Sequence, residues 1–294
     1  MADALSDLSR ALEQRVADSA RLVAGLSWGS RDQLSAMVWQ DGLLVTSEQN
    51  LPDADRYEIV LPGGQRSSAS LVGRDSTTNV AVLRGATAGG QRPPVAEPRA
   101  VGSLVLVVGS DGEGGATARL GGIEVLGPSW QSMRGGRIDR LMRIGVNLPS
   151  GAEGGPVVDT EGAVLGMSTF GPRRGVMVIP SATVARSMEI LLQQGRVARG
   201  WLGVGLHEVA LPHDIAARAG VDGGLMVMGL ADNAPASGQL LPGDILTAIA
   251  GTKVATARAV AALLGPDTVG KALTIDLVRG GAVASVSVVI AARP

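Results

Sequence analysis

Short runs of β-forming residues, separated by turn residues, recur through the first two thirds of this chain. Six runs lie between residues 21 and 84, broken by Gly, Pro, Asp and Asn: Arg21–Leu26, Leu34–Trp39, Leu43–Thr46, Tyr57–Leu61, Ala69–Gly73 and Val80–Arg84. After a Gly-, Pro- and Ala-rich loop at 85–100, six more follow: Leu104–Val108, Thr117–Leu126, Leu141–Val146, Pro156–Asp159, Val164–Phe170 and Val176–Ile179. Many short strands with turns between them predict a barrel or sandwich.

Composition also favours a turn-rich β protein over a helical bundle. Of 294 residues, 42 are Gly, and the aromatic residues are four Trp, one Tyr and one Phe, so aliphatic residues and Met must fill the core. A length of 294 residues predicts about two domains. Because there is no Cys, disulfides, thiolate catalysis and cysteine zinc sites are excluded. No motif predicts a cofactor or another metal site.

The charge balance gives no reason to expect a nucleic acid or an anionic membrane as partner, since 26 basic and 27 acidic residues leave a net charge of −1. No apolar stretch reaches the length of about 18 residues that a transmembrane helix needs. Met1–Ser9 contains two Asp and no basic residue, which is unlike a signal peptide. The sequence as written therefore predicts a cytoplasmic protein, or a periplasmic or other extracytoplasmic one if a leader has been removed.

Two helices are predicted at the ends of the first domain. Apolar residues at spacings of three and four predict an N-terminal helix over residues 1–20, with a face suited to packing or assembly: Leu5, Leu8, Leu12 and Val16. Ser181 is predicted to cap the N-terminus of a later helix, and Gly195 to end it. The first domain is thus expected to span residues 21–196.

A second, smaller domain is expected over residues 199–292. It starts with Arg199–Val204 and continues through four predicted strands: Leu225–Leu230, Ile245–Ile249, Leu273–Arg279 and Ala284–Ile290. Helical runs at residues 212–219 and 257–264 interrupt these strands. This mixture predicts a small α+β domain.

Six segments, taken in order, resemble the HtrA (Deg) family of chymotrypsin-fold serine proteases, in which a protease domain precedes a PDZ domain. The segments are Gly42–Thr46, Gly73–Leu83, Gly151–Val158, Gly162–Gly166, Ile179–Ser181 and Arg199–Val204. Any one of them is a weak signal, whereas six in the right order over nearly the whole chain are specific. The resemblance implies a mainly β fold, a chymotrypsin-like double β-barrel followed by a small α+β PDZ domain.

The resemblance also implies where the catalytic triad of the family falls, and all three positions differ here. The histidine position aligns with Gln49, the aspartate position with Asn79 and the nucleophile position with Glu153, directly before Gly154-Gly155-Pro156. A serine attacks only when a base takes its proton and a third group orients that base. Gln49 has no useful basicity, and Asn79 cannot stabilise an imidazolium.

The backbone N–H groups of Gly151 and Glu153 are expected to persist as a vestigial oxyanion loop, with which a carboxylate at Glu153 would compete. A glycosidase-like mechanism for Glu153 would need a second carboxylate, whereas the side chains expected beside it are amides. Ser47 and Ser150 lack a base and are interpreted as loop hydroxyls.

The remaining candidate groups favour surface roles. His207 with Glu208, and His213 with Asp214, have no familiar metal-ligand spacing. Four arginines are interpreted as solvated residues that flank a loop: Arg134, Arg137, Arg140 and Arg143. The alternative is that they sense an acidic partner.

The second domain keeps the features of a peptide-binding PDZ domain. In such domains, a loop binds the terminal carboxylate with backbone N–H groups, and the peptide adds a strand to the sheet edge. Trp201-Leu202-Gly203-Val204 aligns with that loop, and the groove is expected to be lined by Leu206, Ala259, Val260 and Leu263. This apolar lining predicts a ligand with a hydrophobic C-terminal residue. A PDZ fold used only for packing is the alternative.

The sequence therefore predicts a pseudoprotease that binds peptide or protein C-termini and acts as an adaptor, a chaperone-like protein or a regulatory partner of an active HtrA relative. The alternative is an active HtrA-like endopeptidase with an unrecognised catalytic arrangement, although no His lies between residues 1 and 200. The resemblance also implies a homotrimer assembled through the protease domain, with Trp28 as the single aromatic candidate near the N-terminus.

Overall fold

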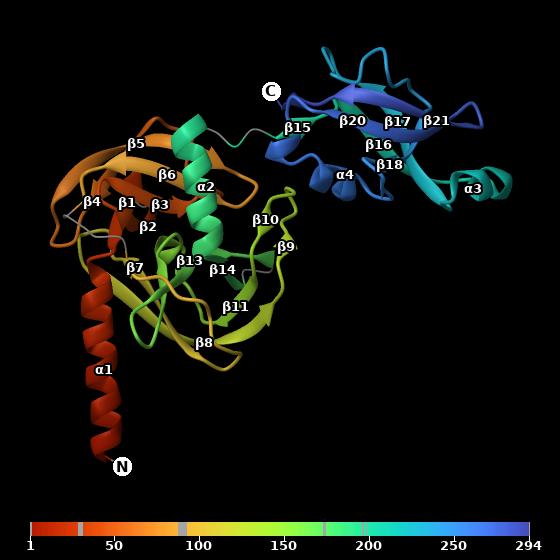
Figure 1. Cartoon of the computed structure of the whole chain (residues 1–294). Coiled ribbons are helices and arrows are strands. Elements are labelled where there is room, and N and C mark those ends of the chain that lie inside the picture. The colour runs from red at the N-terminus through yellow and green to blue at the C-terminus, as the bar shows by residue number, and fades with distance from the viewer. Residues whose placement is uncertain are drawn as a thin grey trace. The chain divides into compact units, whose positions relative to one another are not determined.

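The computed structural model describes residues 2–28, 32–87, 93–172, 175–195, 197 and 199–293. They form two compact units (Figure 1). Unit 1 comprises Met1–Ser132 and Arg137–Val197, and unit 2 comprises Met133–Gly136 and Ala198–Pro294. Residues 88–92 of the predicted loop, and residue 196 at the predicted end of the first domain, lie outside the described residues.

Unit 1 contains two closed six-stranded antiparallel barrels, which confirms the predicted double-barrel fold. The first has the order β1-β2-β3-β6-β5-β4 and consists of β1 (Val23–Trp28), β2 (Asp32–Gln40), β3 (Leu43–Ser47), β4 (Arg56–Val60), β5 (Arg66–Asp75) and β6 (Val80–Gly85). The second has the order β11-β14-β13-β12-β7-β8 and consists of β7 (Leu104–Ser110), β8 (Ala116–Gly127), β11 (Leu141–Gly145), β12 (Pro156–Asp159), β13 (Val164–Phe170) and β14 (Val176–Pro180). A short ribbon of β9 (Trp130–Gln131) and β10 (Arg137–Ile138) lies between β8 and β11 in the sequence.

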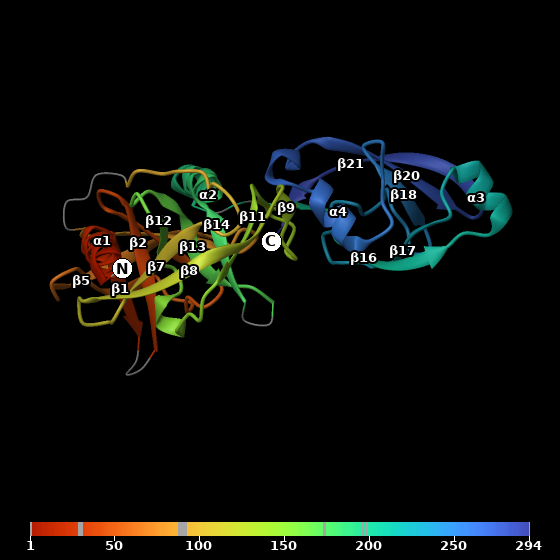
Figure 2. The same cartoon turned by 90° about the horizontal axis from the view of Figure 1, so that it is seen from below.

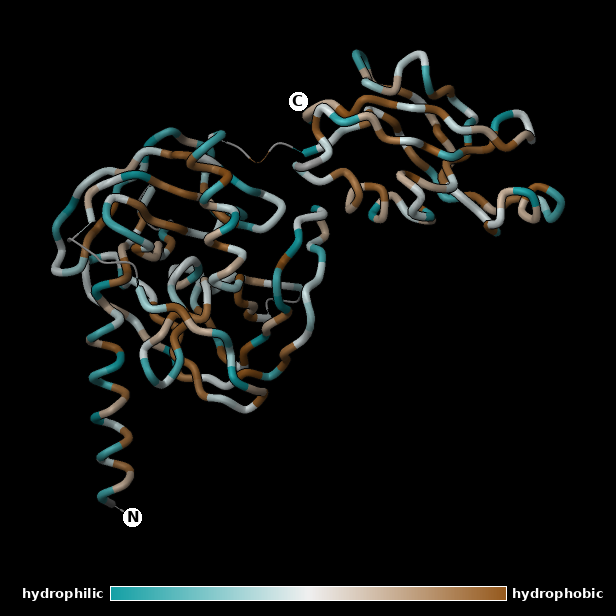
Figure 3. Tube along the Cα trace, in the orientation of Figure 1, coloured by the Kyte–Doolittle hydropathy of each residue, from teal (hydrophilic) through white to brown (hydrophobic). Residues whose placement is uncertain are grey.

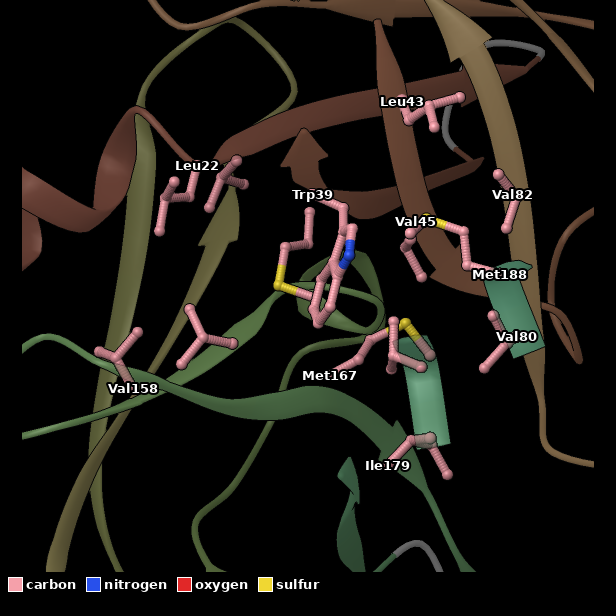
Figure 4. Close-up of a cluster of buried hydrophobic side chains, with 14 of the residues drawn as sticks. Leu22, Trp39, Leu43, Val45, Val80, Val82, Val158, Met167, Ile179 and Met188 are labelled. Carbon is pink, nitrogen blue, oxygen red and sulfur yellow. The ribbon is translucent and has the colours of Figure 1, made fainter. Parts of the chain in front are cut away.

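Aliphatic side chains fill both barrels and the space between them, as the composition requires. Apolar residues concentrate on the strands (Figure 3). Trp39 is fully buried in the cluster that joins the barrels, where Val45 of the first barrel and Met167 of the second belong to the same cluster (Figure 4). Burying one such side chain contributes about 1.5–3 kcal/mol. Each barrel therefore has a core of its own, and a third cluster, which contains Trp39, joins the two barrels.

Helix α1 (Ala2–Ala20) extends from the barrels with an apolar face that is only half covered (Figures 1 and 2). Leu12 and Val16 pack against the cluster that joins the barrels, whereas Leu5 and Leu8 are 71% and 47% exposed. Among the described residues, no helix combines the length and the hydropathy needed to cross a membrane.

Helix α2 (Ser181–Gln194) ends as predicted but does not begin as predicted. Gly195 is left-handed with φ 69°, and its N–H donates to the carbonyl of Leu191 at 2.8 Å. The N-cap is Pro180, and the side-chain cap predicted for Ser181 is wrong. The Ser181 hydroxyl instead donates to the carbonyl of Val164 at 2.9 Å, because this residue is buried against β13.

Unit 2 is a small α+β fold built on one antiparallel sheet. The main path of the sheet is β16 (Val204–Ala210), β17 (Gly223–Leu230), β18 (Ile245–Ile249), β20 (Ala272–Arg279) and β21 (Ala282–Val289), with β19 (Thr252–Lys253) paired to β18. The other elements are α3 (His213–Ala219), α4 (Ala257–Leu263) and the pair β15 (Gly200–Trp201) and β22 (Ala291–Ala292). The helices and strands match the predicted mixture.

One ion pair ties the β17–β18 turn of unit 2 to β20. Asp244 is 2% exposed and accepts hydrogen bonds from Arg279 Nε and Nη2, both at 2.7 Å, and from the N–H of Leu241 at 2.8 Å. The hydrogen bond from the Arg279 guanidinium holds the pKa of the Asp244 carboxyl below its ordinary value. The pair therefore stabilises unit 2 above pH of about 4, and this contribution is lost as the pH falls through the lowered pKa.

We expect Asp244→Asn to lower the urea midpoint of unit 2 at pH 7, because the variant leaves Arg279 without its carboxylate partner. The difference from the wild type should shrink below pH of about 4. Exposed Asp222 provides the matched control, since Asp222→Asn removes the same charge at an unburied position. Equal midpoints for Asp244→Asn and the wild type at pH 7 would contradict the role of the pair.

Candidate functional site

The loop before β12 is held between the two barrels by backbone hydrogen bonds. A 3₁₀ turn, η1 (Ser150–Ala152), leads into it, and the Glu153 N–H donates to the carbonyl of Ser150 at 3.2 Å. The Glu153 carbonyl accepts the N–H of Ser35 on β2, and the N–H of Gly154 donates to Ser168 on β13, both at 2.9 Å. Both barrels thus fix the position of this loop.

Two glycines in this loop are required by the close approach of other backbone segments. Gly154 has φ +88°, and a Cβ atom there would lie 2.2 Å from the carbonyl oxygen of Ser35. A Cβ atom at Gly155 would lie 2.1 Å from the carbonyl oxygen of Val108. Only glycine fits at these positions.

The Glu153 side chain points into the protein, where its carboxylate is surrounded by hydrogen-bond donors. The residue is fully buried. Oε1 accepts from Gln49 Nε2 at 2.6 Å, Ser47 Oγ at 2.8 Å, Thr169 Oγ1 at 2.8 Å and the N–H of Phe170 at 3.2 Å. Oε2 accepts from Asn50 Nδ2. Within the described part of the chain, no Lys or Arg forms an ion pair with this carboxylate, and its five hydrogen-bond donors there are neutral groups.

Asn79 extends this cluster from the turn between β5 and β6. It adopts the left-handed conformation, φ 61°, which Asn tolerates better than most residues. Its Oδ1 accepts the N–H of Gln49 at 2.7 Å, and its Nδ2 donates to Thr169 Oγ1 at 2.6 Å. The Thr169 hydroxyl in turn donates to Glu153, so it links Asn79 to the carboxylate. Side-chain and backbone hydrogen bonds thus connect Gln49, Asn79 and Glu153.

Three residues of this cluster were not recognised from the sequence. The interpretation of Ser47 as a loop hydroxyl is wrong, because it ends β3, is fully buried and donates to Glu153. Asn50 and Thr169 carry no motif that singles them out. Only the fold brings β3, the turn after it and β13 to the same point.

The other polar candidates lie at the surface. Arg137, Arg140 and Arg143 form ion pairs with Asp139, Glu97 and Glu124 at 3.5–3.6 Å. Arg137 and Arg143 are exposed, and Arg140 is half-buried. His207 lies on β16 and His213 begins α3, and both are exposed. The described residues contain no cluster of His, Cys, Asp and Glu that could hold a metal ion.

A cleft of about 1000 Å³ lies against the outer side of the Glu153 cluster. Gln49, Asn50 and Phe170 belong to both, whereas Glu153 is not among the residues that line the cleft. The other described residues of the lining are apolar or neutral except for Asp111, and they include Trp28, Leu34 and Gly151. A ligand in this cleft would therefore meet amide groups rather than the carboxylate.

In unit 2, the Trp201–Val204 segment forms a tight loop between β15 and β16. Gly203 has φ +74°, and a Cβ atom there would lie 2.5 Å from the Cβ of Ala234, so glycine is required. The N–H of Ala231 donates to the carbonyl of Gly203 at 2.8 Å, and the N–H of Ala236 to that of Leu202 at 3.3 Å. These bonds fix the loop against residues 231–236.

The predicted groove residues lie on β16 and α4, which pack beside each other. β16 is a terminal strand of the sheet and pairs with β17 on one side. Leu206, Ala259 and Leu263 are half-buried against the unit 2 core, and Val260 is buried. The structure thus brings together a glycine loop, a sheet edge and an apolar helix face.

The two units match two known domain families. Residues 34–167 match the trypsin-like peptidase domain, and residues 200–290 match the PDZ domain. A probable periplasmic serine endoprotease, DegP-like, from Brucella suis is 30% identical over 271 residues, which cover 88% of this chain and 52% of that protein. The serine endoprotease DegS of Escherichia coli is 29% identical over 234 residues, covering 72% of this chain and 65% of DegS. The chain thus spans about half the length of the DegP-like relatives.

Solved structures match this fold over almost the whole length of the chain. The HtrA-type protease AlgW with a tripeptide is 26% identical, with a TM-score of 0.71 and coverage of 95% of this chain and 96% of that one. A serine endoprotease from Yersinia pestis has the same fold, with a TM-score of 0.75 at 23% identity and coverage of 96% and 98%. With a trypsin-like peptidase domain followed by a PDZ domain, and with DegP-like, DegS and HtrA-type relatives, the chain belongs to the HtrA family.

Proposed function

We propose that this chain is a catalytically inactive member of the HtrA family. It binds peptide or protein C-termini through its PDZ domain and acts as an adaptor, chaperone-like or regulatory protein in protein quality control. The observation that carries the proposal is the Glu153 carboxylate, which is fully buried and accepts five hydrogen bonds in the loop before Gly154-Gly155-Pro156.

Three observations argue against catalysis. A nucleophile must reach the scissile carbonyl, and this carboxylate lies behind Gln49 and Asn50, outside the cleft lining. A general base must accept a proton from the nucleophile, and the chain has no His before residue 207. The Glu153 N–H, a candidate oxyanion donor, is already bonded to Ser150.

The relatives support a second candidate, because the matched proteins are named as serine endoproteases. An active chain would need an unrecognised nucleophile in the cleft. Among the described residues, three hydroxyl side chains line the cleft, those of Ser110, Thr117 and Ser150. No described His residue lines it. Inactivity is therefore the better-supported proposal, and cleavage decides between the two.

The purified chain is expected to leave unfolded casein intact and to resist labelling by a fluorophosphonate probe. The triple variant Gln49→His, Asn79→Asp and Glu153→Ser restores the residue types of a Ser-His-Asp triad at three positions that the cluster already joins. It should cut casein and take up the probe, with turnover several orders of magnitude above the wild type.

The control for this experiment is the same variant with Glu153→Ala in place of Glu153→Ser, which has no hydroxyl to react. Circular dichroism should show that all three proteins are folded. Cleavage or labelling of the wild type would refute catalytic inactivity. If both variants are inactive, the wild-type result still stands, but the claim that positions 49, 79 and 153 can form a working triad is refuted.

The case for peptide binding rests on unit 2. A free carboxylate bound by backbone N–H groups forms charge-assisted hydrogen bonds, which contribute about 1.5–3 kcal/mol each. The Trp201–Val204 loop is the proposed site for that carboxylate, and the half-buried Leu206, Ala259 and Leu263 support a hydrophobic last residue. The peptide would add to β16 as a further strand.

A fluorescent decapeptide ending in leucine is expected to bind the full chain, as measured by anisotropy. Amidation of its C-terminus should weaken binding by about tenfold or more, because the carboxylate contacts are lost. Gly203→Ala should weaken binding in the same way, whereas Gly229→Ala is the control, since a Cβ atom at Gly229 would have no neighbour within 4 Å. Equal affinity for the free and amidated peptides would argue for a PDZ fold used only for packing.

A further inference from the structure

Strand β21 is the terminal strand of the unit 2 sheet on the side opposite β16. It pairs with β20 over eight consecutive residues, from Ala282 with Arg279 to Val289 with Ala272. Within the described residues, no strand pairs with its other edge. Helix α3 approaches only the Gly281 end, where a Cβ atom would lie 3.8 Å from Ile215 Cδ1. Most of this edge is therefore open within unit 2.

The hydrogen-bonding direction along β21 follows from its neighbours. The Ile290 N–H donates to the carbonyl of Lys271 at 2.9 Å, so Ile290 faces β20. The Thr274 carbonyl accepts the N–H of Ala250, so the backbone groups of Thr274 point away from β21. Its partner Ser287 should then point its own backbone groups away from β20. Because this direction alternates along a strand, the outward N–H and C=O groups belong to four residues: Val283, Ser285, Ser287 and Val289.

This edge lacks the features that normally prevent strands from pairing with other strands. Protected edges carry charged side chains, proline or a bulge, or are short. Edge strand β16 has two of these, Glu208 and a register shift after Gly205. In contrast, β21 reads Ala-Val-Ala-Ser-Val-Ser-Val-Val, with neither charge nor proline, and its pairing with β20 is unbroken.

The side chains of β21 are suited to a second copy of the same strand. Antiparallel pairing about a two-fold axis at Val286 places Val283 opposite Val289 and Ser285 opposite Ser287. The outward backbone groups then face one another, and the two valines, 51% and 59% exposed, cover each other. Since identical strands would meet, a charged strand would repel its copy, and this one has no charge.

We propose that β21 is a self-association edge, through which two copies of this chain join their PDZ sheets into one continuous antiparallel sheet. The peptide groove lies at the other end of the sheet, on β16, so both edges can be occupied at once. The proposal does not depend on catalytic inactivity or on peptide binding.

A charge exchange across the two-fold axis tests the proposal in the full chain. In Ser285→Lys with Ser287→Lys, like charges oppose each other twice in the dimer, whereas in Ser285→Lys with Ser287→Glu, opposite charges do. Both variants remove the hydrogen bond from Ser285 Oγ to Asp276, so they are matched. In sedimentation over a concentration series, the wild type should show a step that doubles the mass. The first variant should weaken this step by about tenfold or more, and the second should preserve it.

Cross-linking gives a second readout, because the chain has no cysteine. Directly opposite hydrogen-bonded residues lie about 5.5 Å apart between Cα atoms, within disulfide range. A mixture of Ser285→Cys and Ser287→Cys chains should cross-link on mild oxidation, whereas each variant alone should do so much less. Equal mass steps for both charge variants, or equal cross-linking in mixed and single samples, would overturn the proposal. If β21 instead pairs with a different protein, the two charge variants should behave alike and the mixed sample should cross-link no more than the single ones.

Discussion

The arrangement of the first unit depends on one buried carboxyl group, that of Glu153. A polar group taken out of water is tolerated only when hydrogen bonds replace its hydration. Here five neutral donors do so, Ser47, Gln49 and Asn50 from the first barrel and Thr169 and Phe170 from the second. Both barrels therefore supply hydrogen bonds to the Glu153 side chain.

This arrangement also accounts for the proposed change of function. In the proposed alignment, the amides Gln49 and Asn79 occupy the positions of the family's base and orienting acid. An amide can donate a hydrogen bond to a carboxylate, as Gln49 does to Glu153, but it cannot move a proton at neutral pH. Among the described residues, Asp111 is the one charged residue that lines the cleft. In unit 2, the loop at Gly203 lies before the edge strand β16, beside which α4 packs. Loss of cleavage is thus compatible with retained recognition of polypeptides.

Much of the fold was predictable because it follows local rules. Turn residues at regular intervals set the strands of both barrels, and Gly195 ended α2 as expected from its left-handed conformation. Ser181 was a wrong prediction because a tertiary acceptor, the Val164 carbonyl, competes with the cap. Thr169 and Asn50 could not be found, since their role exists only once β13 and the turn after β3 meet. The inward direction of Glu153 is likewise a product of tertiary packing.

The most direct test of this account is the free energy of unfolding of unit 1 in Glu153→Ala. Urea denaturation at pH 7 can be followed by tryptophan fluorescence, since three of the four Trp residues, Trp28, Trp39 and Trp130, lie in unit 1. Glu189→Ala on the exposed side of α2 is the control. Removing the carboxylate leaves several buried donors unsatisfied, at about 1–3 kcal/mol each, so the account predicts a loss of about 2 kcal/mol or more against little change in the control. A Glu153→Ala protein as stable as the wild type, or more stable, would contradict the view that this carboxylate joins the two barrels.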